Sequence, residues 1–289
     1  MDWREFNQRL RVLLVLGRVS NLPTVWSNCL AAWLLGGGGT GVRFAVLCAG
    51  ATLLYTGGMF LNDAFDQAFD RQYRPERPIV CGQITAKWVW ILGGIWLFLG
   101  TLCIGVLGGL SGVLALVLVA AIVLYDAVHK RTTMGPFLMA GCRFLLYLVA
   151  GSAAQGIIGR GVWWAAAALG VYIVGLSFLA RGESTGANAM RWPTLFLFAP
   201  ILIGLAGTAK LGPPTLIAAA GQGIWTLWCL WGRPKSKRYF FRNEIAGLLA
   251  GIVLVDWLAA APQIPPEYAL VFVGLFLGAL FFQRFAPAT

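Results

Sequence analysis

The sequence predicts an all-α fold, a polytopic transmembrane helical bundle, and three observations point to this class. Of the 289 residues, 59% are hydrophobic and 11% are charged, whereas a soluble domain carries about 25% charged residues. Apolar runs of about 17 to 25 residues, the length that crosses a bilayer, recur along the chain. The basic residues are divided unequally between alternate connections, as the positive-inside rule requires.

Ten apolar segments lie between polar, Gly-rich or Pro-rich breaks, and each is expected to form a membrane-spanning helix. The segments are Val19–Leu35, Phe44–Leu61, Trp88–Leu107, Leu110–Tyr125, Pro136–Ala154, Trp163–Ala180, Pro193–Ala209, Thr215–Trp231, Ile245–Ala261 and Tyr268–Phe282. The polar connections are too short for a soluble domain, about 20 residues at most. Residues 1–289 are therefore expected to form a single transmembrane domain.

The basic residues predict the orientation of the chain. Alternate connections on one side hold 18 of the 22 lysines and arginines, and the opposite connections hold only Arg43, Arg160 and Lys210. This division places the N-terminus and the connection after the second segment in the cytoplasm. It also accounts for the net charge of +11 without a nucleic-acid partner. We expect a multi-pass protein of the cell inner (plasma) membrane.

An acidic cluster follows the second apolar segment. On a helix, Asn62, Asp66 and Asp70 would lie at about 0°, 40° and 80°, and Asp63 at about 100°, so the four side chains share one sector. Carboxylates this close repel one another unless a cation lies among them. Mg²⁺ held by one or two carboxylates and by phosphate oxygens would suit the arrangement. The alternative is a solvated acidic end of a helix, which the helix dipole disfavours at a C-terminus.

Further polar groups lie in the other cytoplasmic connections. Lys130 and Arg131 end the fourth segment and either bind diphosphate oxygens or serve as ordinary positive-inside residues. Glu183 follows the sixth segment and either contributes to a second metal position or forms a surface pair with Arg181. The basic stretch 233–242 is predicted to contact lipid headgroups, which makes membrane lipids an expected partner.

Two charged residues lie inside predicted spans. Arg143 is in the fifth segment and Asp256 is in the ninth. Such residues face a bundle interior or a cavity and find a partner there. Arg143 therefore either pairs with Asp256 or reaches an anionic ligand, and its position near the cytoplasmic end of its span favours the ligand.

These motifs together resemble the UbiA superfamily of intramembrane prenyltransferases. The resemblance rests on Asn62-Asp63-x-x-Asp66-x-x-x-Asp70, the Arg74–Pro78 loop, Gly82–Thr85, Lys130-Arg131 and Arg18–Asn21. It implies a bundle, usually of nine spans, around a central cavity. It also implies Mg²⁺-dependent transfer of an isoprenyl group from its diphosphate to an aromatic or other hydrophobic acceptor. The stretches 21–26 and 179–183 are similar to the EboC-like branch.

The resemblance assigns roles residue by residue. Asn62, Asp66 and Asp70 would bind the diphosphate through Mg²⁺, with Asp66, Asp70 and Lys130 as the catalytic set. The substrate-binding set is Asn62, Arg71, Arg77, Lys130, Arg143 and Arg181, and Glu183 is a further metal candidate. The family's second Asp-rich motif is missing here, because 180–184 holds one acid and adds Arg181. One metal with Arg181 would replace two metals, or catalysis would be weakened or lost.

Two functions therefore remain in view. The first is a prenyltransferase in which an apolar cavity shields the reacting allylic group from water. The second is a membrane carrier or binding protein that holds a lipid diphosphate or hydrophobic metabolite without chemistry, which the degraded second motif would favour.

Overall fold

A computed structural model describes residues 3–39, 41–185, 192–207, 212–231 and 244–285, and these residues form helices without strands. The N-terminal half contains α1 (Trp3–Leu16), a 3₁₀ turn η1 (Val19–Asn21), α2 (Leu22–Leu35), α3 (Val42–Phe65), α4 (Gln67–Tyr73), α5 (Ala86–Gly105) and α6 (Gly109–Val128). The remainder contains α7 (Gly135–Gln155), α8 (Arg160–Thr185), α9 (Pro193–Phe196), α10 (Ala199–Gly207), α11 (Pro213–Trp231), α12 (Glu244–Ala260) and α13 (Tyr268–Phe282). The prediction of an all-α bundle is confirmed.

Each predicted apolar segment contains a helix of the structure. Five of the described helices (α3, α5, α6, α7 and α8) are long and apolar enough to cross a membrane. The seventh predicted segment is divided into α9 and α10, which shortens both. Together with large apolar side chains exposed on the outside of the bundle, such as Phe98 at 64% and Leu116 at 60%, these helices indicate a multi-pass membrane protein. The number of spans stays a prediction.

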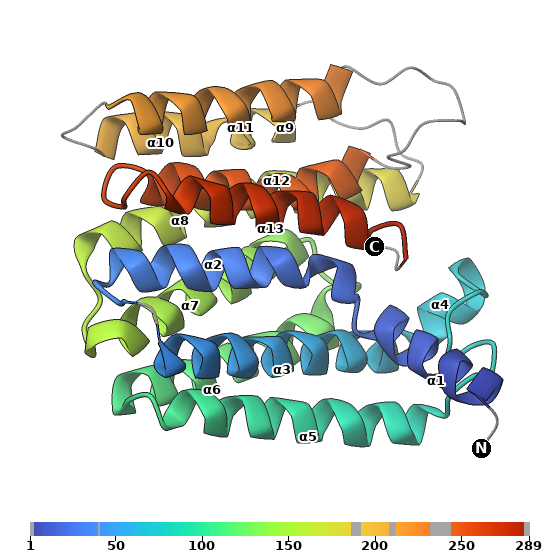
Figure 1. The fold of residues 1–289 in the computed structure, drawn as a ribbon. Helices are drawn as coiled ribbons and strands as arrows, with labels where there is room; N and C mark the ends of the chain where they lie inside the picture. Colours follow the sequence, from blue (N-terminus) through green and yellow to red (C-terminus); the bar gives the residue numbers. More distant parts are fainter. Residues whose placement is uncertain (1–2, 40, 186–191, 208–211, 232–243, 286–289) are drawn as a thin grey trace.

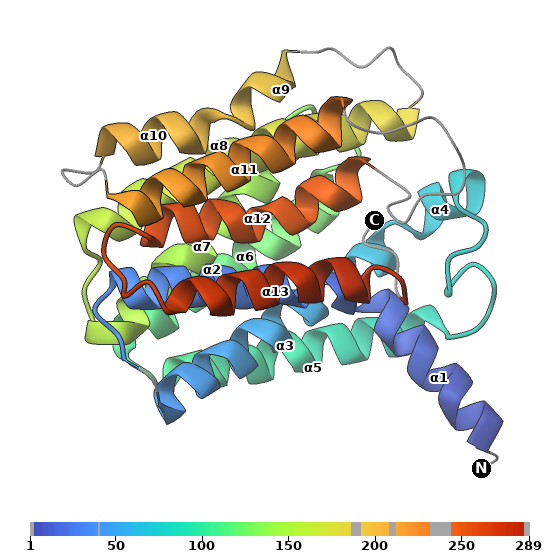
Figure 2. The same ribbon diagram turned by 45° about the horizontal axis from the view of Figure 1, so that its top comes forward.

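The helices pack side by side around a common interior (Figures 1 and 2). α7 packs against α2, α6 and α8, and α12 packs against α2, α8 and α11. The main apolar core is built largely from buried residues of these elements, among them Tyr147 on α7, Tyr172 on α8 and Leu248 on α12. α1 extends obliquely away from the bundle in Figure 2. This arrangement leaves an interior enclosed by α3, α6, α7, α8 and α12.

Glycines set the spacing between α3 and α5. A Cβ atom added at Gly100 would lie 2.9 Å from the carbonyl oxygen of Gly50, and one at Gly57 would lie 3.0 Å from that of Gly93. Only glycine allows backbones to approach this closely, as is typical of helix pairs in membranes. α5 is thereby fixed against the outer side of α3, whose other face lines the interior.

The acidic cluster lies where α3 ends. The helix stops at Phe65, and α4 rises away from its axis (Figure 1). The backbone still makes helical hydrogen bonds across the junction, from Asp66 N–H to Asn62 O at 2.9 Å and from Asp70 N–H to Asp66 O at 2.8 Å. Asn62, Asp66 and Asp70 therefore keep helical spacing, but the bend separates Asp70 from the interior.

Candidate functional site

A cavity of about 620 Å³ occupies the interior of the bundle. Its deep walls are apolar and include Ala51, Leu54, Leu146, Ile173 and Ile252. Its polar walls carry the charged and hydrogen-bonding residues Arg18, Asn62, Asp66, Arg74, Asp126, His129, Lys130, Arg143 and Arg181. Ala51 and Asp66 are 15 residues apart along the chain, or about 22 Å at the helical rise. The space suits a molecule with a polar head and a long apolar tail.

Asp66 is the acidic residue of the cluster that lines the cavity. Its Oδ2 lies 3.4 Å from His129 Nε2 and 3.4 Å from Lys130 Nζ. Burial raises the pKa of Asp66, but contacts with His129 and Lys130 outweigh burial and lower it below its usual value. Burial also lowers the pKa of Lys130, although Asp66 opposes that shift. Lys130 further lies over the Phe69 ring, 4.1 Å from its centre.

Asp63 and Asp70 face other groups. Asp63 is buried between Arg18, at 3.2 Å, and Arg77, at 3.6 Å. Asp70 is 2% exposed, and its Oδ1 has no hydrogen-bond partner among the described residues. Burial, together with the neighbouring carboxylates, raises the pKa of Asp70 despite Arg77 and Arg74 nearby. Asp70 thus offers an open oxygen one helical turn from Asp66.

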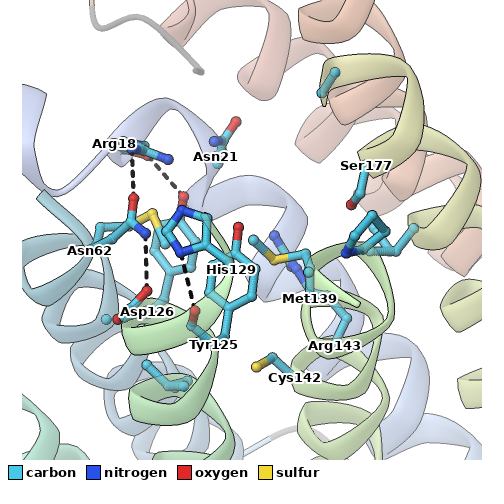
Figure 3. Close-up of a pocket in the computed structure, with 18 of the residues that line it drawn as sticks. Arg18, Asn21, Asn62, Tyr125, Asp126, His129, Met139, Cys142, Arg143 and Ser177 are labelled. Atoms are coloured by element: carbon cyan, nitrogen blue, oxygen red, sulfur yellow. Dashed lines mark hydrogen bonds between the residues drawn. The ribbon is translucent and has the colours of Figure 1, made fainter. Parts of the chain in front are cut away.

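Asn62 connects two helices through its carboxamide (Figure 3). Its Oδ1 accepts a hydrogen bond from Arg18 Nη2 at 3.0 Å, and its Nδ2 donates to Asp126 Oδ1 at 3.0 Å. Arg18 reaches this position because its backbone is in the left-handed region (φ 42°) between α1 and η1. Asn62 lines the cavity, but its oxygen already accepts a hydrogen bond from Arg18.

Arg143 and Asp256 form a second chain of the same kind, joined by Asn28. Arg143 donates to Asn28 Oδ1 at 2.6 Å, and Asn28 Nδ2 donates to Asp256 Oδ2 at 2.7 Å. Asp256 also accepts hydrogen bonds from Ser27 at 2.5 Å and Tyr147 at 2.6 Å. Three donors therefore converge on the two carboxylate oxygens of Asp256. Neither alternative predicted for Arg143 foresaw this relay, in which Arg143 lines the cavity while Asp256 balances its charge from behind.

The remaining predicted residues are distributed as follows. Arg181 lines the cavity and donates to the backbone oxygens of His129 and Thr132, both at 2.7 Å. Arg77 is buried beside Asp63, and Arg71 is exposed. The side chain of Glu183 and the basic stretch 233–242 lie outside the described residues. The structure therefore brings Asn62, Asp66, Lys130, Arg143 and Arg181 to the lining of one cavity, and Asp70, Arg71 and Arg77 stand outside it.

Several wall residues were missed from the sequence. Asp126 and Arg74 were given no role, although an acidic residue next to a predicted apolar span was a signal for Asp126. His129 was not among the predicted site residues, yet its Nε2 lies 3.4 Å from Asp66 Oδ2. Asn28 carried no signal at all, because a neutral amide inside an apolar run shows no charge pattern.

The side chains in and beside the cavity determine which kind of metal site could form there. Among the described residues, no group of three or more His, Cys, Asp or Glu side chains converges as a complete metal site. Mg²⁺ does not need one, since it is usually held by one or two carboxylates and completed by substrate phosphates and water. Asp66 on the cavity wall and Asp70, one helical turn away but outside the cavity, are the carboxylates that could contribute to such a set.

Comparison with known proteins shows which proteins this chain is similar to. The sequence model of the UbiA prenyltransferase family matches residues 20–238. A digeranylgeranylglyceryl phosphate synthase of Ignicoccus hospitalis is 34% identical over 129 residues, 44% of this chain and 42% of that protein. The match to this relative therefore spans less than half of the relative's length.

Two solved structures share the fold. A UbiA homologue from Aeropyrum pernix superposes with a TM-score of 0.65 at 16% identity, over 83% of this chain and 96% of that chain. A UbiA homologue from Archaeoglobus fulgidus bound to DMAPP and Mg²⁺ superposes with a TM-score of 0.54 at 12% identity, over 95% and 97% of the two chains. The family match covers most of the chain and agrees with the helical architecture and the acidic cluster beside the cavity, so this chain belongs to the UbiA prenyltransferase family.

Proposed function

We propose that this protein is an intramembrane prenyltransferase, acting as one transmembrane domain, that transfers an isoprenyl group from its diphosphate to a hydrophobic acceptor. The observation that carries the proposal is the cavity, which joins a charged wall at Asp66, Lys130 and Arg181 to an apolar interior of about 620 Å³. Such a space accommodates a diphosphate head and an isoprenyl tail together. The binding of DMAPP and Mg²⁺ by a homologue of the same fold supports this choice of ligand.

The residues that line the cavity would have different roles in the reaction. Lys130 and Arg181 would place positive charge beside the diphosphate, where negative charge accumulates as the leaving group departs. Asp66 and Asp70 would hold Mg²⁺, which when bound neutralises part of the diphosphate charge. Arg181 would supply a fixed charge where the family's second acidic motif is missing, because two backbone oxygens hold its guanidinium in place. The apolar walls would exclude water from the reacting carbon.

The transfer balances as follows. The bond between the allylic carbon and the diphosphate oxygen breaks, and its electron pair stays with the diphosphate. An electron pair of the acceptor forms the new bond to that carbon, and the proton that the acceptor loses leaves with the diphosphate. The aromatic rings of Tyr55 and Tyr125 line the cavity and would face the developing positive charge.

The test uses the purified full-length chain in detergent with radiolabelled geranyl diphosphate and Mg²⁺. We expect slow Mg²⁺-dependent pyrophosphate release, in which water that enters the vacant acceptor position serves as acceptor when no other is added. Asp66→Asn should reduce the release about 100-fold or more, because it removes a carboxylate that would hold Mg²⁺ at the diphosphate. Glu76→Gln, an exposed acid of the same loop, is the matched control and should retain the wild-type rate. Tight binding of intact geranyl diphosphate without release would instead favour the carrier function.

We further propose that the protein lies in the plasma membrane with its N-terminus and the acidic cluster in the cytoplasm. The division of the basic residues supports this orientation. Cysteine replacements at exposed Gln72 and at exposed Glu267 in intact cells test it. A membrane-impermeant maleimide should label position 267 and spare position 72, and the reverse pattern would overturn the orientation.

A further inference from the structure

Helix α1 carries a row of apolar side chains that the described part of the chain leaves exposed. Trp3 is 72% exposed, Phe6 41%, Leu10 43% and Leu14 41%, and the rings of Trp3 and Phe6 stack on each other. At about 100° per residue, these four side chains, the apolar stripe, fall within a sector of about 80° on one side of the helix. Large apolar side chains gathered in this way indicate a surface that binds something apolar.

The opposite side of α1 packs against the bundle. Val12 and Leu16 are buried and belong to an apolar cluster that also contains Ala64 on α3 and Val89 on α5. Both lie about 180–220° around the helix from Trp3, which is the side opposite the apolar stripe. The protein therefore holds α1 on one side, and the stripe faces outward.

The same contacts fix the level of α1 relative to a bilayer. Ala64 is the last residue but one of α3, and Val89 is the fourth residue of α5. Both helices are long and apolar enough to cross a membrane. The second half of α1 therefore packs where two spans leave the hydrocarbon layer, which is the level of the lipid headgroups. From there the first half of α1 extends away from the bundle (Figure 2).

Basic side chains border the apolar stripe on both edges. Arg9 and Arg11 are exposed, and each lies about 60° beyond one edge of the stripe. Glu5, the one acidic residue of α1, lies on the opposite side of the helix, about 200° from Trp3. An apolar face of Trp, Phe and Leu beside basic residues is typical of helices that lie in the interface of an anionic bilayer.

A second protein chain would suit this surface less well. A protein groove that binds an amphipathic helix recognises its apolar side chains, which gives no reason for arginine on both edges. Beside a bilayer, arginine keeps its aliphatic stem in the apolar layer and its guanidinium group among the headgroups. The borders of the stripe therefore favour a lipid surface.

We propose that α1 binds the surface of the membrane that holds the bundle, with its apolar stripe below the headgroups and with Arg9 and Arg11 on the phosphates of anionic lipids. α1 has 14 residues, or a length of about 21 Å, so the whole stripe can lie along the interface. The inference goes beyond the proposed prenyl transfer, since this surface lies outside the cavity and its binding to lipid requires no diphosphate.

The test measures amide hydrogen exchange of residues 3–11 by mass spectrometry, in the purified full-length chain with one chain in each lipid nanodisc. The nanodiscs contain phosphatidylcholine alone or phosphatidylcholine with anionic phosphatidylglycerol. Exchange should be about tenfold slower or more with phosphatidylglycerol, because a docked helix opens less often and each arginine strengthens docking about fivefold. Added salt should reduce this difference. Equal exchange in the two lipids would overturn the proposal.

Variants assign the effect to the arginines and to the stripe. Arg9→Gln and Arg11→Gln should each lower the phosphatidylglycerol effect about fivefold, and glutamine is about as good a helix former as arginine. Arg160→Gln removes an exposed charge on α8 and should leave the effect unchanged. Leu10→Ser should speed exchange in both lipids, whereas Gln8→Ser, at an exposed position outside the stripe, should have little effect.

Two further outcomes would overturn the inference. Equal effects of Leu10→Ser and Gln8→Ser would show that the stripe contacts no lipid. Slow exchange in detergent that depends on protein concentration would assign the stripe to a second copy of the chain. A chain that docks α1 yet releases no pyrophosphate from geranyl diphosphate would refute only the proposed transfer, so the two proposals fail by different measurements.

Discussion

Replacing Asp256 by alanine should destabilise the protein strongly, because it removes the charge that balances Arg143 inside the bundle. Asp256 is fully buried and accepts hydrogen bonds from Ser27, Asn28 and Tyr147. Neutral hydrogen bonds between membrane helices contribute only about 0.6 kcal/mol on average. Arg143 and Asp256 do not touch, since Asn28 lies between them, but loss of Asp256 would still leave a buried charge uncompensated, which in a direct buried ion pair costs about 3–5 kcal/mol. We therefore expect a loss of about 3–5 kcal/mol for Asp256→Ala.

The charge contribution is isolated by a double-mutant cycle. Arg143→Met removes the other charge while keeping an unbranched side chain, and the double variant Arg143→Met/Asp256→Ala leaves neither charge uncompensated. We expect the double variant to be destabilised by less than the sum of the two single variants, with a coupling of about 1–3 kcal/mol. Asp256→Asn should lie between wild type and Asp256→Ala, because the carboxamide keeps an acceptor but carries no charge.

The assay is reversible unfolding in mixed micelles of increasing SDS content, followed by far-UV circular dichroism. Free energies are compared at one detergent composition inside the transition. The reasoning is refuted if Asp256→Ala costs less than about 1 kcal/mol, the size of a neutral hydrogen bond. It is equally refuted by strict additivity in the cycle, because Arg143 and Asp256 would then be independent despite the Asn28 relay.

Three further predictions address packing, charge and pH. Gly100→Ala should cost about 1–3 kcal/mol of unfolding free energy, since its Cβ would lie 2.9 Å from the Gly50 carbonyl oxygen. Gly94→Ala on the same helix is the control and should be neutral, because its Cβ would meet nothing within 4 Å. Equal melting temperatures of the two variants would contradict this prediction. Lys130→Gln should lower the rate of pyrophosphate release about 100-fold, with exposed Lys87→Gln as the control, and similar rates for both would remove Lys130 from the site. Burial raises the pKa of Asp66, but contacts with His129 and Lys130 lower it by more, so its pKa is lower in the folded protein than in the unfolded chain. Ionised Asp66 therefore stabilises the folded state at a pH above the pKa of the unfolded chain, and this contribution is lost as the pH falls through the pKa of the folded protein. Wild type should therefore lose more stability than Asp66→Asn when melting is followed from pH 5 to pH 3 (roughly the range in which unfolded aspartate titrates), and parallel curves would show that Asp66 contributes none.

The sequence predicted the helices well because each apolar segment is long and continuous. The clearest departure is at the acidic cluster, where the repeat of Asn62, Asp66 and Asp70 predicted one helical sector. The structure keeps the helical spacing but bends the chain at Asp66, which places Asp66 on the cavity wall and Asp70 beside it. Nothing in the local sequence marks that bend, since it contains neither glycine nor proline.

Polar partners were harder to predict than helices. Arg143 and Asp256 were recognised as interior charges, because each interrupts an apolar run. A direct pair between them was one of the two alternatives, but the relay that joins them was not predicted, since it depends on Asn28, which lies 115 residues from Arg143 in sequence. The relay from Arg18 through Asn62 to Asp126 was missed for the same reason. A charged residue in an apolar segment can be identified from the sequence. The neutral asparagine that joins two such charges can be identified only once the helices that carry them are placed in space.

The contact between Lys130 and Asp66 has a consequence for how a diphosphate arrives. Lys130 lies 3.4 Å from Asp66, so its charge is partly balanced by a carboxylate of the protein itself. A cation bound at Asp66 would leave the ammonium group of Lys130 available to the diphosphate. Lys130 would then contact Asp66 before the diphosphate binds and the diphosphate afterwards. Without Mg²⁺, the cavity would have a low affinity for the free phosphates of the cell.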